Sequence, residues 1–140
     1  MSFLHADLRH NWNNKRLMKR WLKEVIASFN LKTGSIQIIS CSDEYLLEVN
    51  RKFLQHDYYT DIITFDESEK DVINGDLIIS IERVRENAEQ YGVSTEEELN
   101  RVIVHGILHL VGFRDKSEKE ISTMRKEENK ALSALKGLTV

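Results

Sequence analysis

The sequence of 140 residues has no proline, a single cysteine and no long apolar run. The single cysteine, Cys41, excludes an internal disulfide framework and fits a reducing compartment. It ends a strand-like apolar segment, so we expect a small buried residue there. No stretch approaches the ~20 apolar residues of a membrane span, and the first ten residues lack the apolar run of a signal peptide. These absences predict a soluble, cytoplasmic protein with no membrane partner.

A strong excess of charge is also missing. The formal net charge is −3, so the bulk charge carries no nucleic-acid signature, and an anionic partner would have to be met by a local patch. No Gly/Ser-rich linker, repeat or low-complexity tract divides the chain. Because 140 residues suit one hydrophobic core, we predict a single domain over residues 1–140.

Hydrophobic periodicity predicts strands near residues 3–4 and over 35–41, 60–65 and 76–81, and helices beginning near 13, 42, 82, 95 and 117. Asn74-Gly75 has turn chemistry that suits an antiparallel hairpin between the last two strands. The helix from residue 95 is apolar over most of its circumference, so it should be central. The apolar faces of the other helices include Tyr45, Phe53, Tyr91 and Ile121. This order of elements indicates an α+β fold, a small mixed four-stranded sheet packed against about five helices.

Two histidines and an aspartate in the segment H-G-I-L-H-L-V-G-F-R-D, residues 105–115, have the spacing of metal ligands. Residues four apart on a helix lie on one face, so His105 and His109 can aim two imidazoles at one point. Gly112 can end the helix and let the chain turn, which brings Asp115 back toward that point. The result is a three-ligand N, N, O set with a fourth position open, as expected of a catalytic zinc site.

A histidine pair on a helix is more often a packing or surface feature than a ligand pair. Here the pair lies on the helix predicted to be most buried, where an unpaired imidazole costs a few kcal/mol. The spacing also matches the zincin pattern H-E-x-x-H-x-x-G-x-x-H, with Gly106 at the glutamate and Asp115 at the third ligand. Because peptide hydrolysis needs that glutamate as its general base, Gly106 argues against a protease.

The same segment closely resembles the H-G-x-L-H-L-x-G-[YF]-D-H signature of the YbeY family, bacterial endoribonucleases needed for ribosomal-RNA maturation. Four further segments resemble the family in the same order. V-N followed by F at residues 49–53 and T-D-I-I-T-F at 60–65 resemble L-N-x-x-[YF]-R…T-D-V-L-S-F, and G-D-L-I-I-S at 75–80 resembles G-D-I-x-I-S. Residues 120–124 resemble the acidic and methionine pattern of the last helix.

The resemblance implies a single α+β domain with a metzincin-like zinc helix, in which one Zn²⁺ is held by His105, His109 and the residue at 115. It implies hydrolysis of single-stranded RNA, with a role in 3′-end processing of the small-subunit ribosomal RNA and in ribosome quality control. A zinc-bound water or a zinc-polarised phosphate would carry the reaction. The implied partners are single-stranded RNA and ribosomal RNA or the small ribosomal subunit, without a nucleotide cofactor.

The sequence departs from the family pattern at several positions. Asp115 stands at the third histidine, which lowers the charge of the site, makes a bound water less acidic and admits manganese or iron. Leu54 stands at the arginine expected to contact RNA phosphate, and Tyr59 and Asp66 stand at prolines. By proximity in sequence, the predicted RNA contacts are Arg51, Lys52, His56 and Arg114.

Other interpretations remain open. Asn50 and Asp61 are turn or cap residues in one reading, while Asp61 and Thr64 shape a substrate groove in the other. A basic helix face is either a solvated surface or a phosphate-contacting one; it comprises Lys15, Arg16, Lys19, Arg20 and Lys23. Asp115 and Leu54 also suit a ribosome-associated assembly factor with a largely structural metal. A metal-dependent hydrolase of a peptide or amide is disfavoured by Gly106.

Overall fold

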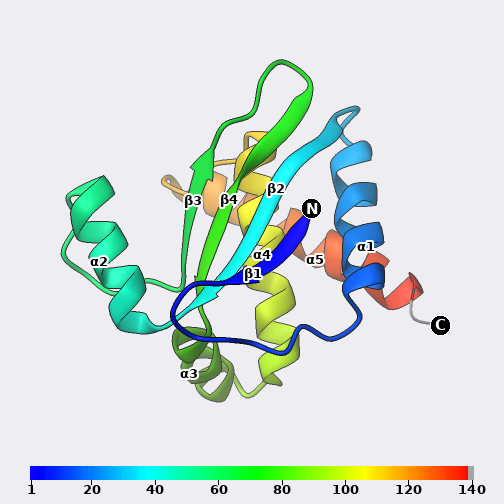
Figure 1. Cartoon of the computed structure of the whole chain (residues 1–140). Helices are drawn as coiled ribbons and strands as arrows, with labels where there is room; N and C mark the ends of the chain where they lie inside the picture. Colours follow the sequence, from blue (N-terminus) through cyan, green and yellow to red (C-terminus); the bar gives the residue numbers. More distant parts are fainter. Residues whose placement is uncertain (139–140) are drawn as a thin grey trace.

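The computed structural model describes residues 1–138. Its elements are β1 (Ser2–His5), α1 (Lys15–Ala27), β2 (Lys32–Cys41), α2 (Asp43–Leu54), β3 (Ile62–Asp66), β4 (Val72–Ser80), α3 (Ile81–Tyr91), α4 (Thr95–Val111) and α5 (Glu118–Leu138). The strands form one sheet in the order β1-β2-β4-β3, in which only β3 runs antiparallel to its neighbour (Figure 1). The predicted α+β fold with a small mixed sheet is therefore confirmed. No helix within residues 1–138 has the length and apolar character needed to cross a membrane.

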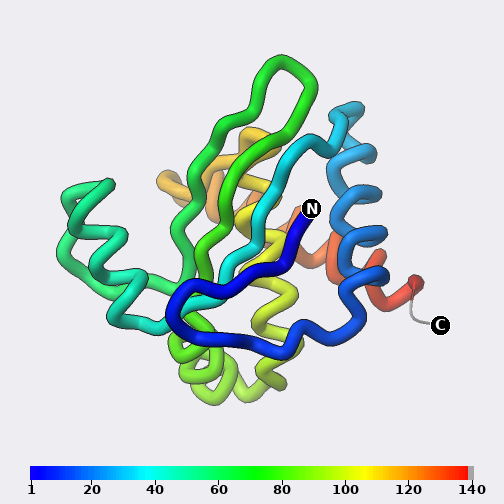
Figure 2. Tube along the Cα trace, viewed as in Figure 1, coloured from blue at the N-terminus to red at the C-terminus, as the bar shows by residue number. Residues whose placement is uncertain are grey.

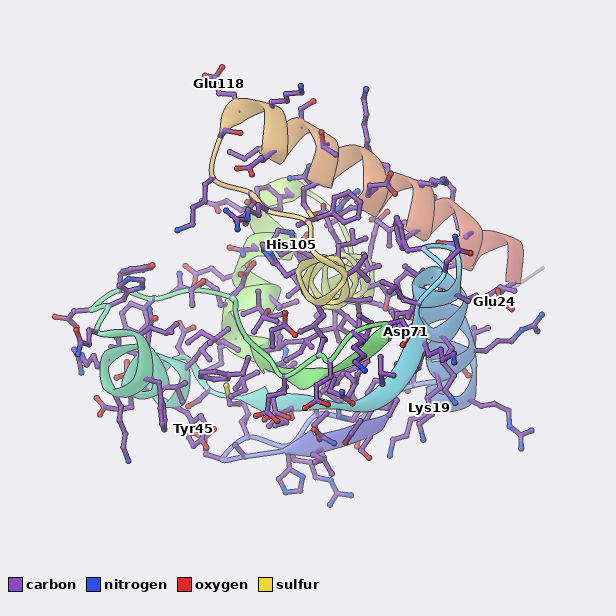
Figure 3. All side chains as sticks on the ribbon, turned by 90° about the horizontal axis from the view of Figure 1, so that it is seen from above. Lys19, Glu24, Tyr45, Asp71, His105 and Glu118 are labelled. Carbon is purple, nitrogen blue, oxygen red and sulfur yellow. The ribbon has the colours of Figure 1, made fainter. Side chains whose placement is uncertain are left out.

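Helix α4 lies between the sheet and α5 (Figure 3). Its apolar residues pack with those of β2 and β4, including the fully buried Leu77 and Ile79, and this cluster forms the main core. The residues predicted to make α4 the central helix are all buried: Leu99, Val102, Ile103, Ile107 and Leu110. Helix α1 is joined to α5 because Trp21 Nε1 donates a 2.8 Å hydrogen bond to the carbonyl of Ala131.

A smaller cluster occupies the other face of the sheet, under α2, and includes Cys41, Leu46, Val49 and Ile63. Cys41 is fully buried, as predicted. Burial raises the pKa of its thiol to about 12, and nearby carboxylates add to the effect, so the thiol stays protonated. Helix α2 and the segment that follows it lie beside β3, at one edge of the sheet (Figure 2). Helix α1 lies at the opposite end of the molecule (Figure 1), which separates its basic face from α2.

Gly106 on α4 has a packing role that its place in the motif does not reveal. A Cβ atom at this position would lie 2.7 Å from Leu77 Cδ2 and 2.8 Å from Ile62 Cδ1. Both distances are shorter than ordinary van der Waals contact, so the glycine lets α4 approach β3 and β4 closely. Gly106 thus faces the sheet, and any larger side chain here would have to displace core residues.

Two local predictions were wrong. Asn74 and Gly75 lie inside β4 and not in the hairpin turn, because the β3–β4 pairing continues until Asp66 pairs with Gly75. The chain reverses between residues 67 and 71, where Lys70 takes a positive φ of 53°. The expected inward positions on α2, α3 and α5 are also exposed; they are Tyr45, Phe53, Tyr91 and Ile121.

Candidate metal centre

The end of α4 brings two histidines and an aspartate together. His105 and His109 share one face of the helix, and their Nε2 atoms are 3.0 Å apart. Gly112 ends the helix with φ +123°, and its N–H donates to the carbonyls of Leu108 and His109. A side chain at this φ would be strained. The chain therefore reverses as expected, and Asp115 Oδ2 lies 3.3 Å from the Nε2 atom of each histidine.

Hydrogen bonds on the far side of each ring indicate which nitrogen carries the proton. His109 Nδ1 lies 3.0 Å from the carbonyl oxygen of Phe113, and His105 Nδ1 lies 2.6 Å from Glu128 Oε2. A carbonyl and a carboxylate accept hydrogen bonds, so each Nδ1 is the donor. In the neutral rings, both Nε2 atoms then present lone pairs toward Asp115. Three acceptors that converge within hydrogen-bonding distance repel one another unless a cation lies among them.

The dimensions of the cluster fit a metal ion. Each residue offers one ligand atom, and these atoms all lie within 4.8 Å of one another. A tetrahedral zinc with ligands at about 2.0–2.1 Å separates its donor atoms by roughly 3.3–3.4 Å. The observed separations of 3.0 and 3.3 Å are close to that value. The two histidine side chains are about one-quarter exposed and Asp115 is 41% exposed, which leaves one side of the cluster open to solvent.

Glu128 on α5 supports the cluster from behind, although no motif in the sequence predicted this role. Its side chain is 5% exposed and also pairs with Arg101 at 2.9 Å and Arg125 at 3.3 Å. Burial opposes its ionisation, but the hydrogen bonds from His105 and Arg101 outweigh burial and lower the pKa of Glu128. A glutamate four residues after the buried Met124, on the inner face of an amphipathic helix, is the signal that could have revealed it.

The charges around His105 favour its protonation when no metal is bound. Burial opposes the imidazolium, but the hydrogen bond and charge of Glu128 outweigh this, and Asp115 and Asp61 add to the effect. The pKa of His105 is therefore raised. Since a bound metal needs the neutral ring, a proton and a metal compete for this histidine.

The cluster lies between two clefts. The loop cleft, of about 530 Å³, is bounded by α2, the segment after it, and β3. Besides the three cluster residues it is lined by Asn50, Leu54, His56, Tyr58, Thr60, Asp61, Ile62, Ile63, Thr64, Asp66 and Lys116. The acidic cleft, of about 550 Å³, lies between the start of α4 and α5. Its charged residues are Asp61, Glu97, Glu98, Arg101, Asp115, Arg125 and Glu128.

Asp61 lines both clefts, which agrees with its predicted place in a groove, and Thr64 lines the loop cleft. Burial raises the pKa of Asp61, while the charge of His105 and two backbone N–H groups oppose the rise. Asn50 has a structural role: it is almost fully buried, and its side-chain amide donates to the carbonyl of Tyr58. Asn50 therefore holds the segment between α2 and β3 in place, and this role replaces the turn or cap role considered for it.

The residues predicted to contact RNA lie in different places. His56 lines the loop cleft with the cluster, and so does Leu54. Arg51, Lys52 and Arg114 line neither cleft. Arg51 pairs with Glu48 and Asp57, while Lys52 lies 5.6 Å from the centre of the Phe53 ring. Their contacts with RNA stay predictions. Lys116, which the sequence analysis did not single out, lines the loop cleft.

Comparison with known proteins places this geometry in a family. The family described as Endoribonuclease YbeY matches residues 5–136. A protein of that name from Bacteroides thetaiotaomicron is 55% identical over 119 residues, 85% of this chain and 87% of its own length. One from Parabacteroides distasonis is 53% identical over 135 residues, 96% and 95% of the two chains. A solution structure from Thermotoga maritima has a TM-score of 0.64 and 26% identity, and covers 98% of this chain and 93% of its own. The chain therefore belongs to the YbeY endoribonuclease family.

Proposed function

We propose that this protein is a metal-dependent endoribonuclease that cleaves single-stranded RNA in ribosomal-RNA processing. The observation that carries the proposal is the convergence of His105, His109 and Asp115 at the junction of two clefts. The relatives that match most of this chain are named endoribonucleases, which supports RNA as the substrate. We extend the proposal to 3′-end maturation of the small-subunit RNA and to ribosome quality control, with residues 1–140 acting as one domain in the cytoplasm.

The three proposed metal ligands are His105 and His109, through Nε2, and Asp115, through Oδ2. When bound, a Zn²⁺ ion supplies Lewis acidity toward a phosphoryl oxygen or water. Asp115 contributes one negative charge that a third histidine would not, so manganese or iron also suits the site. Glu128 and the carbonyl of Phe113 hold the two imidazoles in orientation. This support lowers the cost of ordering the rings around the cation.

The first experiment compares cleavage of single-stranded RNA by metal-loaded protein, a chelator-treated sample and the variant His109→Ala. Casein is offered to the same samples as a second substrate. The proposal expects RNA cleavage by the loaded protein alone and no cleavage of casein. RNA cleavage that persists in His109→Ala and after chelation would contradict it.

Two other functions give different results in this assay. An assembly factor with a structural metal would bind ribosomal RNA or the small subunit without cleaving RNA, and chelation would lower its melting temperature. A hydrolase acting on peptides or amides would cleave casein. The packing of Gly106 against Leu77 and Ile62 leaves no room for the glutamate that zincin proteases use at this position, which disfavours the protease.

A further inference from the structure

An aromatic ring pair lies in the loop cleft on the segment between α2 and β3. His56 and Tyr58 have ring centroids 5.2 Å apart and an interplanar angle of 25°, so the rings are stacked. The hydroxyl of Tyr58 and Nδ1 of His56 are 3.0 Å apart, within hydrogen-bonding distance. Tyr58 is 54% exposed. The pair therefore presents aromatic surface inside the cleft that also contains the metal cluster.

The ring pair is fixed in place by a buried side chain. The Asn50 side-chain amide donates to the carbonyl of Tyr58 at 2.9 Å, and the carbonyl of Asn50 accepts from the N–H of His56 at 3.1 Å. Asn50 is 1% exposed, so its side chain is itself held in place by the surrounding protein. Asp57, which lies between His56 and Tyr58 in the sequence, pairs with Arg51. Because the loop is held before any ligand arrives, binding there would cost little conformational entropy.

Both clefts have more carboxylates than lysines and arginines along their described walls, and they differ in what else lines them. The acidic cleft has five carboxylates and two arginines along its described walls, so it disfavours a polyanion. In the loop cleft, three carboxylates, Asp61, Asp66 and Asp115, accompany Lys116, the one lysine or arginine among the described lining residues, which directly follows the proposed ligand Asp115. Leu54 and the ring pair, which are apolar or aromatic, line the same cleft. A phosphate would therefore lie near the metal and Lys116, and the uncharged part of the nucleotide would lie near the rings.

We propose that the His56–Tyr58 pair is a base-binding subsite, on which an unpaired nucleobase stacks while a phosphate of the same strand lies at the metal centre. The inference rests on the proposed function, since it assumes an RNA strand in the loop cleft. Aromatic side chains bind single strands in this way because every base has a π-face. A base held inside a duplex cannot offer that face, so the subsite selects single-stranded RNA.

The test measures binding of metal-loaded protein to a fluorescein-labelled single-stranded RNA octamer by anisotropy, with the octamer checked for cleavage afterwards. Tyr58→Leu removes the ring but keeps apolar volume, and we expect at least roughly fivefold weaker binding, the lower end for one stacked base. Tyr58→Phe keeps the ring and should bind as the wild type does. Tyr45→Leu is the matched control, because Tyr45 is 41% exposed but lines neither cleft.

A series of octamers, each with one abasic position, identifies the contact. One abasic position should weaken binding to the wild type and to Tyr58→Phe, but cause little further loss in Tyr58→Leu, because the partner ring is already gone. Salt dependence separates base from phosphate contacts. Tyr58→Leu should leave the slope of log K against log salt unchanged, whereas Lys116→Gln should make it shallower by roughly 0.7.

The subsite is refuted if Tyr58→Leu binds the octamer as tightly as the wild type, or if every abasic octamer weakens both proteins equally. Failure of the proposed function has a different signature. If the wild type binds the octamer through Tyr58 but no metal-dependent cleavage is detected, the nuclease is wrong and the subsite stands. If cleavage is normal and Tyr58→Leu changes nothing, the nuclease stands and the subsite is wrong.

Discussion

Glu128 on α5 accepts a 2.6 Å hydrogen bond from Nδ1 of His105 on α4, which joins the C-terminal helix to the candidate metal centre. Helix α5 begins with a capping box, in which Ser117 Oγ accepts from the N–H of Glu120 and Glu120 Oε1 accepts from the N–H of Ser117. This cap follows Asp115 by two residues. The start of α5 is thus fixed next to the proposed ligand Asp115. The third turn of α5 carries Glu128, the hydrogen-bond partner of the proposed ligand His105.

Removing the charge of Glu128 should weaken metal binding. We expect Glu128→Gln to lower the affinity for Zn²⁺ by about 10–100-fold, because a carboxylate partner orients the imidazole and increases its basicity. Competition with a chromophoric chelator measures the change, and circular dichroism of the metal-free protein reports folding. Glu118→Gln, on the exposed start of the same helix, is the control. Equal affinities for the two variants would show that Glu128 does not support the metal.

Asp115 should set the pH range of activity. Its negative charge makes the site a weaker Lewis acid than an all-histidine site, so we expect activity at higher pH. Asp115→His should therefore move the rising limb of the pH–rate profile for RNA cleavage to lower pH. Asp71→Asn, in the hairpin between β3 and β4, is the control for a lost carboxylate. A profile that does not move in Asp115→His would contradict this electrostatic role.

Gly106 should be required for stability. Its missing Cβ is where Leu77 and Ile62 approach α4, so Gly106→Ala should destabilise the protein by roughly 1–3 kcal/mol through overpacking. Urea unfolding of the metal-free protein gives the free energy of unfolding without a contribution from metal binding. Gly137→Ala, also in a helix, has nothing within 4 Å of its added Cβ and should be neutral or slightly stabilising. A Gly106→Ala variant as stable as the wild type would rule out the close packing.

Glu98 should make stability depend on pH. It is 6% exposed, and burial, with the charge of Asp61, raises the pKa of its carboxyl above the ordinary 4.5, although Arg101 and Arg125 oppose this. A raised pKa means that the folded protein binds the proton more tightly than the unfolded chain. The ionised glutamate therefore costs stability above its folded pKa, and this cost disappears as the pH falls below 4.5.

Replacing Glu98 by glutamine should accordingly raise the melting temperature at pH 7–8 by roughly 2–5 °C. The gain should disappear near pH 4, where the wild-type side chain is protonated in both states. Glu96→Gln is the control, since Glu96 occupies the same first turn of α4 but is exposed. A gain of the same size in both variants would point to the helix terminus and not to burial.

Several features followed from the sequence because they depend on residues close together in the chain. Four-residue spacing places His105 and His109 on one face of any helix, and Gly112 permits the turn after them. Ser94 directly precedes α4, and its hydroxyl accepts from the N–H of Glu97 at 3.0 Å, which is the local contact of a helix N-cap. The order of periodic segments was enough to predict a mixed four-stranded sheet with helices.

Other features depend on how distant segments pack, and only the tertiary structure decided them. The hairpin turn moved away from Asn74-Gly75 because strand pairing, and not local turn chemistry, set the register. Glu128 is 23 residues from His105 and reaches it only because α5 crosses α4. In the same way, Tyr58 and Lys116 are 58 residues apart in the sequence but line one cleft. Periodicity determines which way the side chains of one helix or strand point, but the contacts between elements depend on how their surfaces fit together.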